Sequence, residues 1–254
     1  LFSELPYLER PAAARRAGFR WVESAWPAAA ERAGVPRAAA DAGVRVALLN
    51  CSAGQVDRGE RGFINCPSRR EEAERAFAAA LTLAGQLGAP VVNVLVGRAL
   101  EGVSAVRQRA AVVSALRAFA AEAAVRGLRI VIEPLNATEN PGYLAPAPKD
   151  ALTLIEAVGS DSVGLLFDVY HVARAGADPL AAIAEAGGRI GHVQISDFPG
   201  RGQPGSGALD LRGILDALAA GGYSGAIGLE YQPPAAGTAA SLAFLGEGGW
   251  PASL

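Results

Sequence analysis

Short apolar segments alternate with longer segments of helical spacing along the whole chain. The longer segments are rich in Ala, Leu, Glu and Arg, and two of them, 69–88 and 106–127, end at a glycine suited to a helix C-terminus. Several short segments, such as VVNVLV and LRIVIE, are nearly all apolar, which is typical of strands covered on both faces. Helices between successive strands imply parallel pairing. The predicted strands are residues 19–23, 44–50, 90–96, 128–133, 163–168, 189–195 and 226–230.

An open doubly wound sheet and a closed (β/α)8 barrel both satisfy this alternation. No GxGxxG follows an early strand and no GxxxxGK[ST] occurs, so the phosphate loops of the open folds are missing. Polar residues instead stand at the predicted carboxyl ends of different strands, where barrel enzymes keep their chemistry. These residues are Glu23, Asn50, Glu133, Asp168, Gln194 and Glu230. The sequence therefore favours a (β/α)8 TIM barrel, with residues 1–254 as a single domain.

A barrel of this type has eight strands, whereas the pattern shows seven. A helix-like stretch, residues 4–17, precedes the first of them. The chain contains no methionine, so Leu1 is not a translated start. We therefore expect the first strand to belong to an N-terminal piece that is missing from the sequence.

Composition and charge exclude several classes of protein. The chain is 51% hydrophobic and carries 23 basic against 25 acidic residues, for a net charge of −2. This balance argues against a nucleic-acid-binding surface and against a polybasic membrane anchor. No uninterrupted apolar run of eighteen residues suggests a membrane span. The two cysteines, Cys51 and Cys66, are read as free thiols, which suits a cytoplasmic protein.

Four polar residues follow four successive predicted strands: Glu133 in VIEPLN, Asp168 in LLFDVYH, Gln194 in HVQISD and Glu230 in GLEYQP. In a closed barrel these side chains meet at one mouth. Three carboxylates at such close range repel one another and need a cation or protons. Carboxylate and amide oxygens suit Mg²⁺ or Mn²⁺ better than zinc or copper. We expect a divalent metal site; the alternative is that each residue caps a helix or pairs with an arginine.

The chain has two histidines. His171 follows Asp168 by three residues and is expected over the same mouth, either as a hydrogen-bond donor to substrate or as a group that supports a metal ligand. His192 lies two residues before Gln194 on the same strand face, one layer deeper, and a core histidine is an equal reading. The one lysine, Lys149, is not at a strand end, which argues against a Schiff-base aldolase.

A long polar loop, residues 50–66, follows the second predicted strand on the same face as the polar strand ends. Loops of this length are often lids or binding loops. Arg61 in this loop, Arg98 and Arg201 are candidates to bind a substrate carboxylate, while each of them also fits a solvated surface position.

The motifs IEPLN with PGY, FDVYH, HVQISDFPGR and GYSGAIGLEY resemble the hydroxypyruvate isomerase family, within the wider xylose-isomerase-like barrels. The resemblance implies a divalent-metal enzyme that interconverts hydroxypyruvate and tartronate semialdehyde. It implies that Glu133 and Glu230 are the acid/base pair and metal ligands, and that Asp168 and Gln194 complete the metal shell. His171 and Glu139 match positions that contact substrate in related epimerases.

Three alternatives remain open at this point. The same fold and metal would serve a four-carbon 2-oxo acid (2-oxo-tetronate) isomerase or a ketose 3-epimerase. Phosphodiester hydrolysis occurs on related barrels, but two histidines and a pI near 5.8 do not favour it. A non-catalytic binding protein would hold its carboxylates with arginines and bind no metal. The expected partner is a small 2-oxo acid or sugar, and a homo-oligomer is one option for the assembly.

Overall fold

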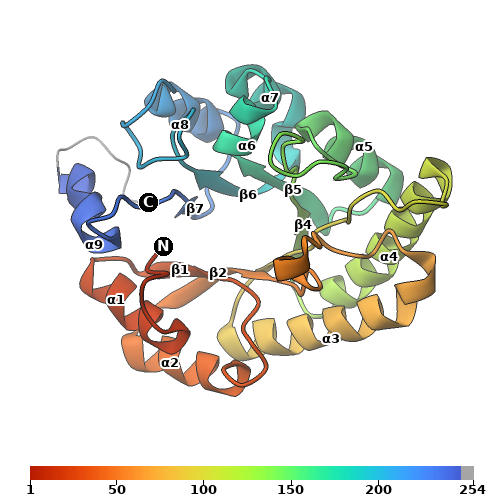
Figure 1. The fold of residues 1–254 in the computed structure, drawn as a ribbon, viewed down its shortest axis with the longest axis horizontal. Coiled ribbons are helices and arrows are strands. Elements are labelled where there is room, and N and C mark those ends of the chain that lie inside the picture. The colour runs from red at the N-terminus through yellow and green to blue at the C-terminus, as the bar shows by residue number, and fades with distance from the viewer. Residues whose placement is uncertain (247–254) are drawn as a thin grey trace.

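Seven parallel strands form one sheet in chain order in the computed structural model, which describes residues 1–246. The sheet curls into a nearly closed barrel with helices around its outside (Figure 1). The strands are β1 (Trp21–Ser24), β2 (Arg45–Asn50), β3 (Val91–Asn93), β4 (Arg129–Ile132), β5 (Val163–Asp168), β6 (Ile190–Ile195) and β7 (Ile227–Leu229). The seven predicted strands and the barrel are confirmed, and β3 and β7 are shorter than predicted.

Most helices lie between successive strands, as the alternation predicts, while α1 precedes β1 and α9 follows β7. They are α1 (Arg10–Arg16), α2 (Val35–Ala42), α3 (Arg70–Leu87), α4 (Ala105–Val125), α5 (Pro148–Val158), α6 (Val169–Arg174), α7 (Pro179–Ala186), α8 (Leu211–Ala220) and α9 (Thr238–Ser241). Short 3-10 turns cover Tyr7–Glu9, Arg32–Gly34, Val56–Arg58, Pro67–Arg69, Gly187–Arg189 and Leu242–Gly246. No helix among these residues is long and apolar enough to cross a membrane.

The ends of two helical segments show how local sequence sets the boundaries. Gly88 ends α3 with a φ of 62°, a left-handed conformation that costs glycine little. The stretch predicted as a helix over residues 4–17 becomes regular only at Arg10. Pro6 precedes a 3-10 turn instead of the first turn of α1.

The inside of the barrel is arranged in layers because alternate strand residues point to the same face. Four buried apolar side chains contact one another in one layer: Leu48, Val91, Val131 and Leu166. Two residues further along the same four chain segments stand Asn50, Asn93, Glu133 and Asp168. A polar layer therefore lies directly above an apolar one, at the carboxyl ends of the strands.

The ends of the sheet, β1 and β7, share no ladder in the described residues. Contacts outside the barrel hold this seam together. The Phe2 backbone N–H donates to Thr238 Oγ1 at 2.8 Å, and Glu4 accepts from the Thr238 backbone N–H at 2.9 Å. An apolar cluster that includes Phe2, Tyr231 and Phe244 packs beside these bonds.

The main core lies between the sheet and the helices. Phe77 of α3 and Phe119 of α4 stack there with ring centroids 4.1 Å apart, and Phe77 is fully buried. Residues of both helices pack against the apolar outer faces of the strands. The two helices are thus joined through one aromatic pair.

We expect Phe77→Ala to lower the free energy of unfolding by about 3–5 kcal/mol, because it removes the stacked ring and leaves a cavity. Urea unfolding followed by circular dichroism measures this change. The control is Val125→Ala at a side chain that is 90% exposed, where we expect a change within about 0.5 kcal/mol. Equal effects of the two substitutions would contradict the assignment of the core.

Candidate metal centre and active site

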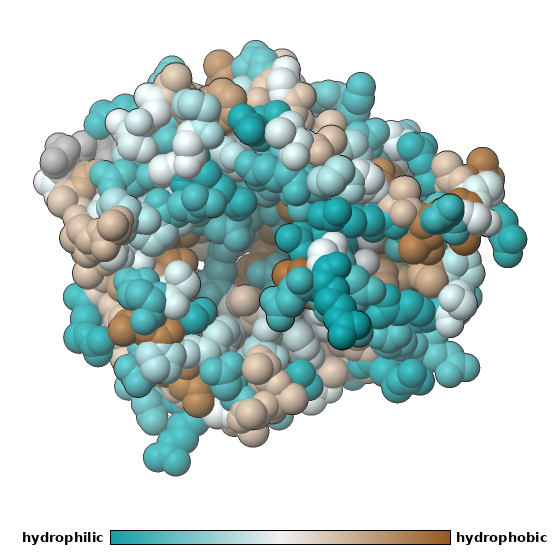
Figure 2. All heavy atoms as spheres, viewed as in Figure 1, coloured by the Kyte–Doolittle hydropathy of each residue, from teal (hydrophilic) through white to brown (hydrophobic). Residues whose placement is uncertain are grey.

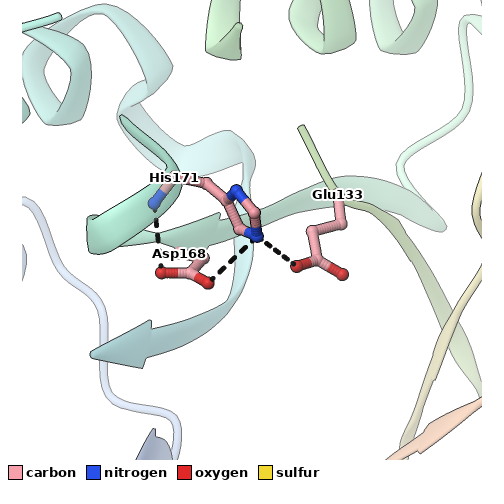
Figure 3. Close-up of side chains that lie close together, drawn as sticks. All are labelled: Glu133, Asp168 and His171. Carbon is pink, nitrogen blue, oxygen red and sulfur yellow. Dashed lines mark hydrogen bonds and ion pairs between the residues drawn. The ribbon is translucent and has the colours of Figure 1, made fainter. Parts of the chain in front are cut away.

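Asp168 is placed by the junction between β5 and α6. It is the last residue of the strand and caps the helix, with its Oδ1 accepting from the backbone N–H groups of Tyr170 at 2.8 Å and His171 at 3.4 Å. The helix begins immediately, so the side chain of His171 returns over the strand end. Its Nε2 lies 3.7 Å from Asp168 Oδ2 and 4.0 Å from Glu133 Oε1 (Figure 3).

The tautomer of His171 follows from its other ring nitrogen. Nδ1 accepts from the Asn136 backbone N–H at 3.2 Å and lies 2.7 Å from the Asn136 amide nitrogen. Nδ1 is therefore unprotonated, and Nε2 carries the hydrogen. Burial, with the charge of Arg201 adding to it, lowers the pKa of His171 to about 4. His171 is neutral at pH 7 and presents an N–H donor toward the two carboxylates.

Glu133 follows β4 and is buried at the same level as Asp168. The amide nitrogen of Asn93 donates to Glu133 Oε2 at 2.9 Å, which leaves Oε1 facing His171. Burial raises the pKa of Glu133 well above its usual range, and the charges of Glu230 and Asp168 raise it further. Burial and the charge of Glu230 likewise raise the pKa of Asp168 to about 8. The positive charge near the pair does not offset the cost of burying two carboxylates, and a bound cation would reduce that cost.

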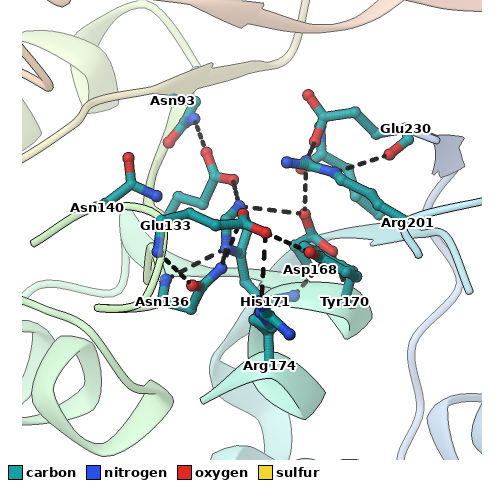
Figure 4. A network of polar contacts seen from close by, with 12 residues as sticks. Asn93, Glu133, Asn136, Asn140, Asp168, Tyr170, His171, Arg174, Arg201 and Glu230 are labelled. Carbon is teal, nitrogen blue, oxygen red and sulfur yellow. Dashed lines mark hydrogen bonds and ion pairs between the residues drawn. The ribbon is translucent and has the colours of Figure 1, made fainter. Parts of the chain in front are cut away.

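Arg201 joins Asp168 to Glu230 across the mouth (Figure 4). Its NH2 donates to Glu230 Oε2 at 2.8 Å and to Asp168 Oδ2 at 3.3 Å, while its guanidinium lies 5.1 Å from the centre of the Tyr170 ring. The side chain of Glu230 is 45% exposed and stands outside the tight group of Glu133, Asp168 and His171. Glu230 is thus near the predicted site but is held by an arginine.

Gln194 lies beside Asp168 in the β5–β6 register. Its amide nitrogen donates to Glu23 Oε2 at 2.7 Å, and its amide oxygen is buried without a hydrogen-bond partner. This orphaned oxygen, together with Glu133 Oε1 and Asp168 Oδ2, makes a set of oxygen donors. Such a set fits a hard divalent cation.

The remaining predicted residues occupy the rim. Glu139 accepts from the Tyr170 hydroxyl and from the Asn136 amide nitrogen at 3.1 Å. Arg61 donates to the carbonyl of Glu60 at 2.8 Å and to Asn140 Oδ1 at 3.1 Å. The second bond joins the 50–66 loop to the segment between β4 and α5. Hydrophilic residues lie above and to the right of the hollow at the centre of this view (Figure 2).

Sequence reasoning assigned no role to Asn93 or Asn136. Asn93 interrupts the apolar run VVNVLV two positions after the inward-facing Val91, so strand alternation alone could have placed it beside Glu133. Asn136 belongs to the quoted motif IEPLN, but its bond to His171 spans 35 residues and depends on the fold.

Residues 11–247 match the family described as Xylose isomerase-like TIM barrel. The chain belongs to the xylose isomerase-like TIM-barrel family. Within this family, a putative hydroxypyruvate isomerase of Streptomyces coelicolor is 39% identical over 98% of this chain and 93% of its own. The hydroxypyruvate isomerase of Escherichia coli is 33% identical, covering 92% and 90% of the two chains. The predicted resemblance to hydroxypyruvate isomerases is confirmed.

Two further family members differ in the activity that their names state. A 2-oxo-tetronate isomerase of Haemophilus influenzae is 31% identical over 92% of this chain and 90% of its own. A crystal structure from Brucella melitensis, described as an AP endonuclease of family 2, superposes with a TM-score of 0.92. It is 29% identical and covers 97% of this chain and 95% of its own. Proteins named as isomerases and a protein named as an endonuclease are therefore both similar to this chain.

We expect Mn²⁺ at about 100 times its Kd to raise the Tm of the protein by about 5–10 °C, as preferential binding to the folded state requires. Asp168→Asn should remove this shift, because the amide keeps the helix cap but loses the charge. Differential scanning fluorimetry measures both. The matched control is Asp210→Asn, at the N-cap of α8, where the Gly213 backbone N–H donates to Oδ1 at 3.0 Å. A full Mn²⁺ shift in Asp168→Asn would contradict this metal centre.

Proposed function

We propose that this protein is a divalent-metal isomerase that moves a carbonyl group between adjacent carbons of hydroxypyruvate or a closely related 2-oxo acid. The observation that carries the proposal is the buried group of Glu133, Asp168 and His171 at the carboxyl ends of the strands. The identity to named isomerases over nearly the full chain supports the reaction class. Mg²⁺ and Mn²⁺ are the proposed metals because the available donors are oxygens.

The reaction needs two carbon–proton exchanges. A base takes a proton from carbon 3 of hydroxypyruvate, a proton is delivered to carbon 2, and the hydroxyl proton moves from the oxygen on carbon 3 to that on carbon 2. A bound divalent cation supplies Lewis-acid stabilisation of the negative charge that develops between the two oxygens. Glu133 and Glu230 lie on different sides of Asp168 and Arg201, so each can face one side of a substrate in the mouth (Figure 4).

The environment of Glu133 suits a base. Asn93 holds one of its oxygens, which fixes the carboxylate and leaves the other oxygen free. Burial raises the pKa of Glu133 well above its usual range, and a carboxylate with a raised pKa is a stronger proton acceptor. The neutral His171 donates its Nε2 hydrogen to a substrate oxygen in the same mouth.

Arg201 is the proposed partner of the substrate carboxylate. Its side chain is 20% exposed at the mouth and its guanidinium contacts two carboxylates, so it can also bind the carboxylate of an acidic substrate. Glu139 and Arg61 stand at the rim as further substrate contacts. An arginine in this position favours a 2-oxo acid over a neutral ketose, and 2-oxo-tetronate is the alternative acid.

For the whole protein we also propose a single domain over residues 1–254, a cytoplasmic location and a small-molecule partner without nucleic acid. A homo-oligomer is one option for its assembly. The two free cysteines, Cys51 and Cys66, support the reducing compartment.

An assay on metal-stripped protein tests the proposal. We expect no conversion of hydroxypyruvate to tartronate semialdehyde without metal, and restored turnover with Mg²⁺ or Mn²⁺. Glu133→Gln should abolish turnover while the circular dichroism spectrum and Tm stay near those of the parent, because the amide cannot accept the substrate proton.

Glu230→Gln should give the same loss if it is the second member of the acid/base pair. Near-normal turnover in a folded Glu133→Gln variant would remove the assignment. Metal binding without conversion of hydroxypyruvate would move the proposal to 2-oxo-tetronate or a ketose.

We expect Arg201→Gln to raise the KM for hydroxypyruvate by about 10–100-fold, since a charge-assisted bond is lost. Steady-state kinetics at saturating metal separates KM from kcat. The matched control is Arg117→Gln, because Arg117 donates to the carbonyls of Val158 and Ala157 on another part of the barrel. An unchanged KM in Arg201→Gln would show that the carboxylate binds elsewhere.

A further inference from the structure

Glu23 is an acidic residue inside the barrel to which the proposed reaction assigns no part. It lies on β1 opposite Leu48 of β2, beside the seam where the sheet does not close. Its side chain is 20% exposed, and both of its oxygens face nitrogen atoms of β6. His192 Nε2 lies 2.5 Å from Oε1, and Gln194 Nε2 lies 2.7 Å from Oε2.

A carboxylate selects one orientation of a neighbouring amide because an ionised carboxylate accepts hydrogen bonds and donates none. The NH2 end of Gln194 must therefore face Glu23. The amide oxygen then points away from Glu23, and it is this atom that is buried without a partner. If the amide were reversed, two oxygens would face each other and the NH2 group would take the place of the oxygen donor.

The position of Glu23 is itself supported from two sides. His192 is 3% exposed and directs a ring nitrogen at Oε1. Gly228 on β7 leaves room for the carboxylate, since a Cβ at this position would lie 1.9 Å from Oε1. A buried histidine thus contacts the carboxylate, and a strand glycine leaves the space that the carboxylate occupies beside Gln194.

We propose that Glu23 is a positioning residue that presents the Gln194 amide oxygen to the divalent cation. The inference rests on the proposed metal-dependent function and extends it to a residue that binds neither metal nor substrate. Groups that orient metal ligands in this way typically change metal affinity by about 10–100-fold when they are removed.

The contrasting explanation is that Glu23 only bridges the seam between β1 and β7. Glu4 offers a direct comparison, because it also spans the seam, by accepting from the backbone N–H and the hydroxyl of Thr238. Loss of a bridge lowers the stability of the metal-free protein. Loss of an orienting residue lowers metal affinity through Gln194.

A double-mutant cycle on the full chain separates these two roles. Mn²⁺ affinity is measured by electron paramagnetic resonance of the free ion for the parent, Glu23→Leu, Gln194→Ala and the double variant. We expect Glu23→Leu to weaken Mn²⁺ binding by about 10–100-fold. In the Gln194→Ala background the same change should alter affinity by less than about threefold, because the group that Glu23 orients is gone.

Two further variants sharpen the test. Glu23→Gln should recover most of the affinity, since its amide oxygen still accepts from Gln194 while His192 can carry its proton on Nδ1. Glu4→Leu, the matched control, should lower the Tm of the metal-free protein and leave Mn²⁺ affinity unchanged. If Glu23→Leu does not fold, Gly228→Ala displaces the carboxylate instead and should weaken Mn²⁺ binding in the same way.

The outcomes that overturn the inference are distinct from those that overturn the function. Parent-like Mn²⁺ affinity in folded Glu23→Leu, or equal losses with and without Gln194, refutes the positioning role and leaves the metal enzyme intact. If Glu23→Gln loses as much Mn²⁺ affinity as Glu23→Leu, the positioning role is also refuted. The charge of Glu23, and not its orientation of Gln194, would then support metal binding. A parent protein that binds no Mn²⁺ refutes both.

Discussion

Glu133 and Asp168 are buried side by side at the carboxyl ends of β4 and β5, with less positive charge around them than two carboxylates need. Several groups around the two carboxylates lower the free-energy cost of burying them. Asn93 donates to one carboxylate, the start of α6 donates to the other, and Arg201 reaches in from the loop after β6. The bonds reduce the cost of burial without removing it, which keeps the site suited to a cation.

The layered interior of the barrel strengthens the effect of this constraint. The apolar layer of Leu48, Val91, Val131 and Leu166 excludes water from below the carboxylates, so their charges act in a region of low polarity. Interactions between a cation, these acids and a substrate are stronger there than they would be in water. The hollow at the centre of the molecule stays open, with hydrophilic residues along part of its edge (Figure 2).

Much of the fold could be predicted from the chain alone, since strand and helix periods differ and the glycine-ended helical segments stand out. The strand 163–168 matches β5 residue for residue, whereas 90–96 extends beyond β3. Val96 bonds to the Tyr143 hydroxyl instead of a neighbouring strand. The structure brings Glu133 and Asp168 together with His171, and it places Arg201 between Asp168 and Glu230. The roles of these residues stay predictions. The contact between Gln194 and Glu23 spans 171 residues, so no local pattern could reveal it.

The order of the elements, the inward face of each strand and the chemical types gathered at the mouth depend on local periodicity and on parallel pairing, so they follow from the amino-acid sequence. Three-dimensional packing sets which oxygen of each carboxylate is free, which nitrogen of His171 carries the hydrogen, and which way the Gln194 amide faces. These properties depend on single hydrogen bonds between residues far apart in the chain. Angles and distances of that kind arise only when the barrel folds.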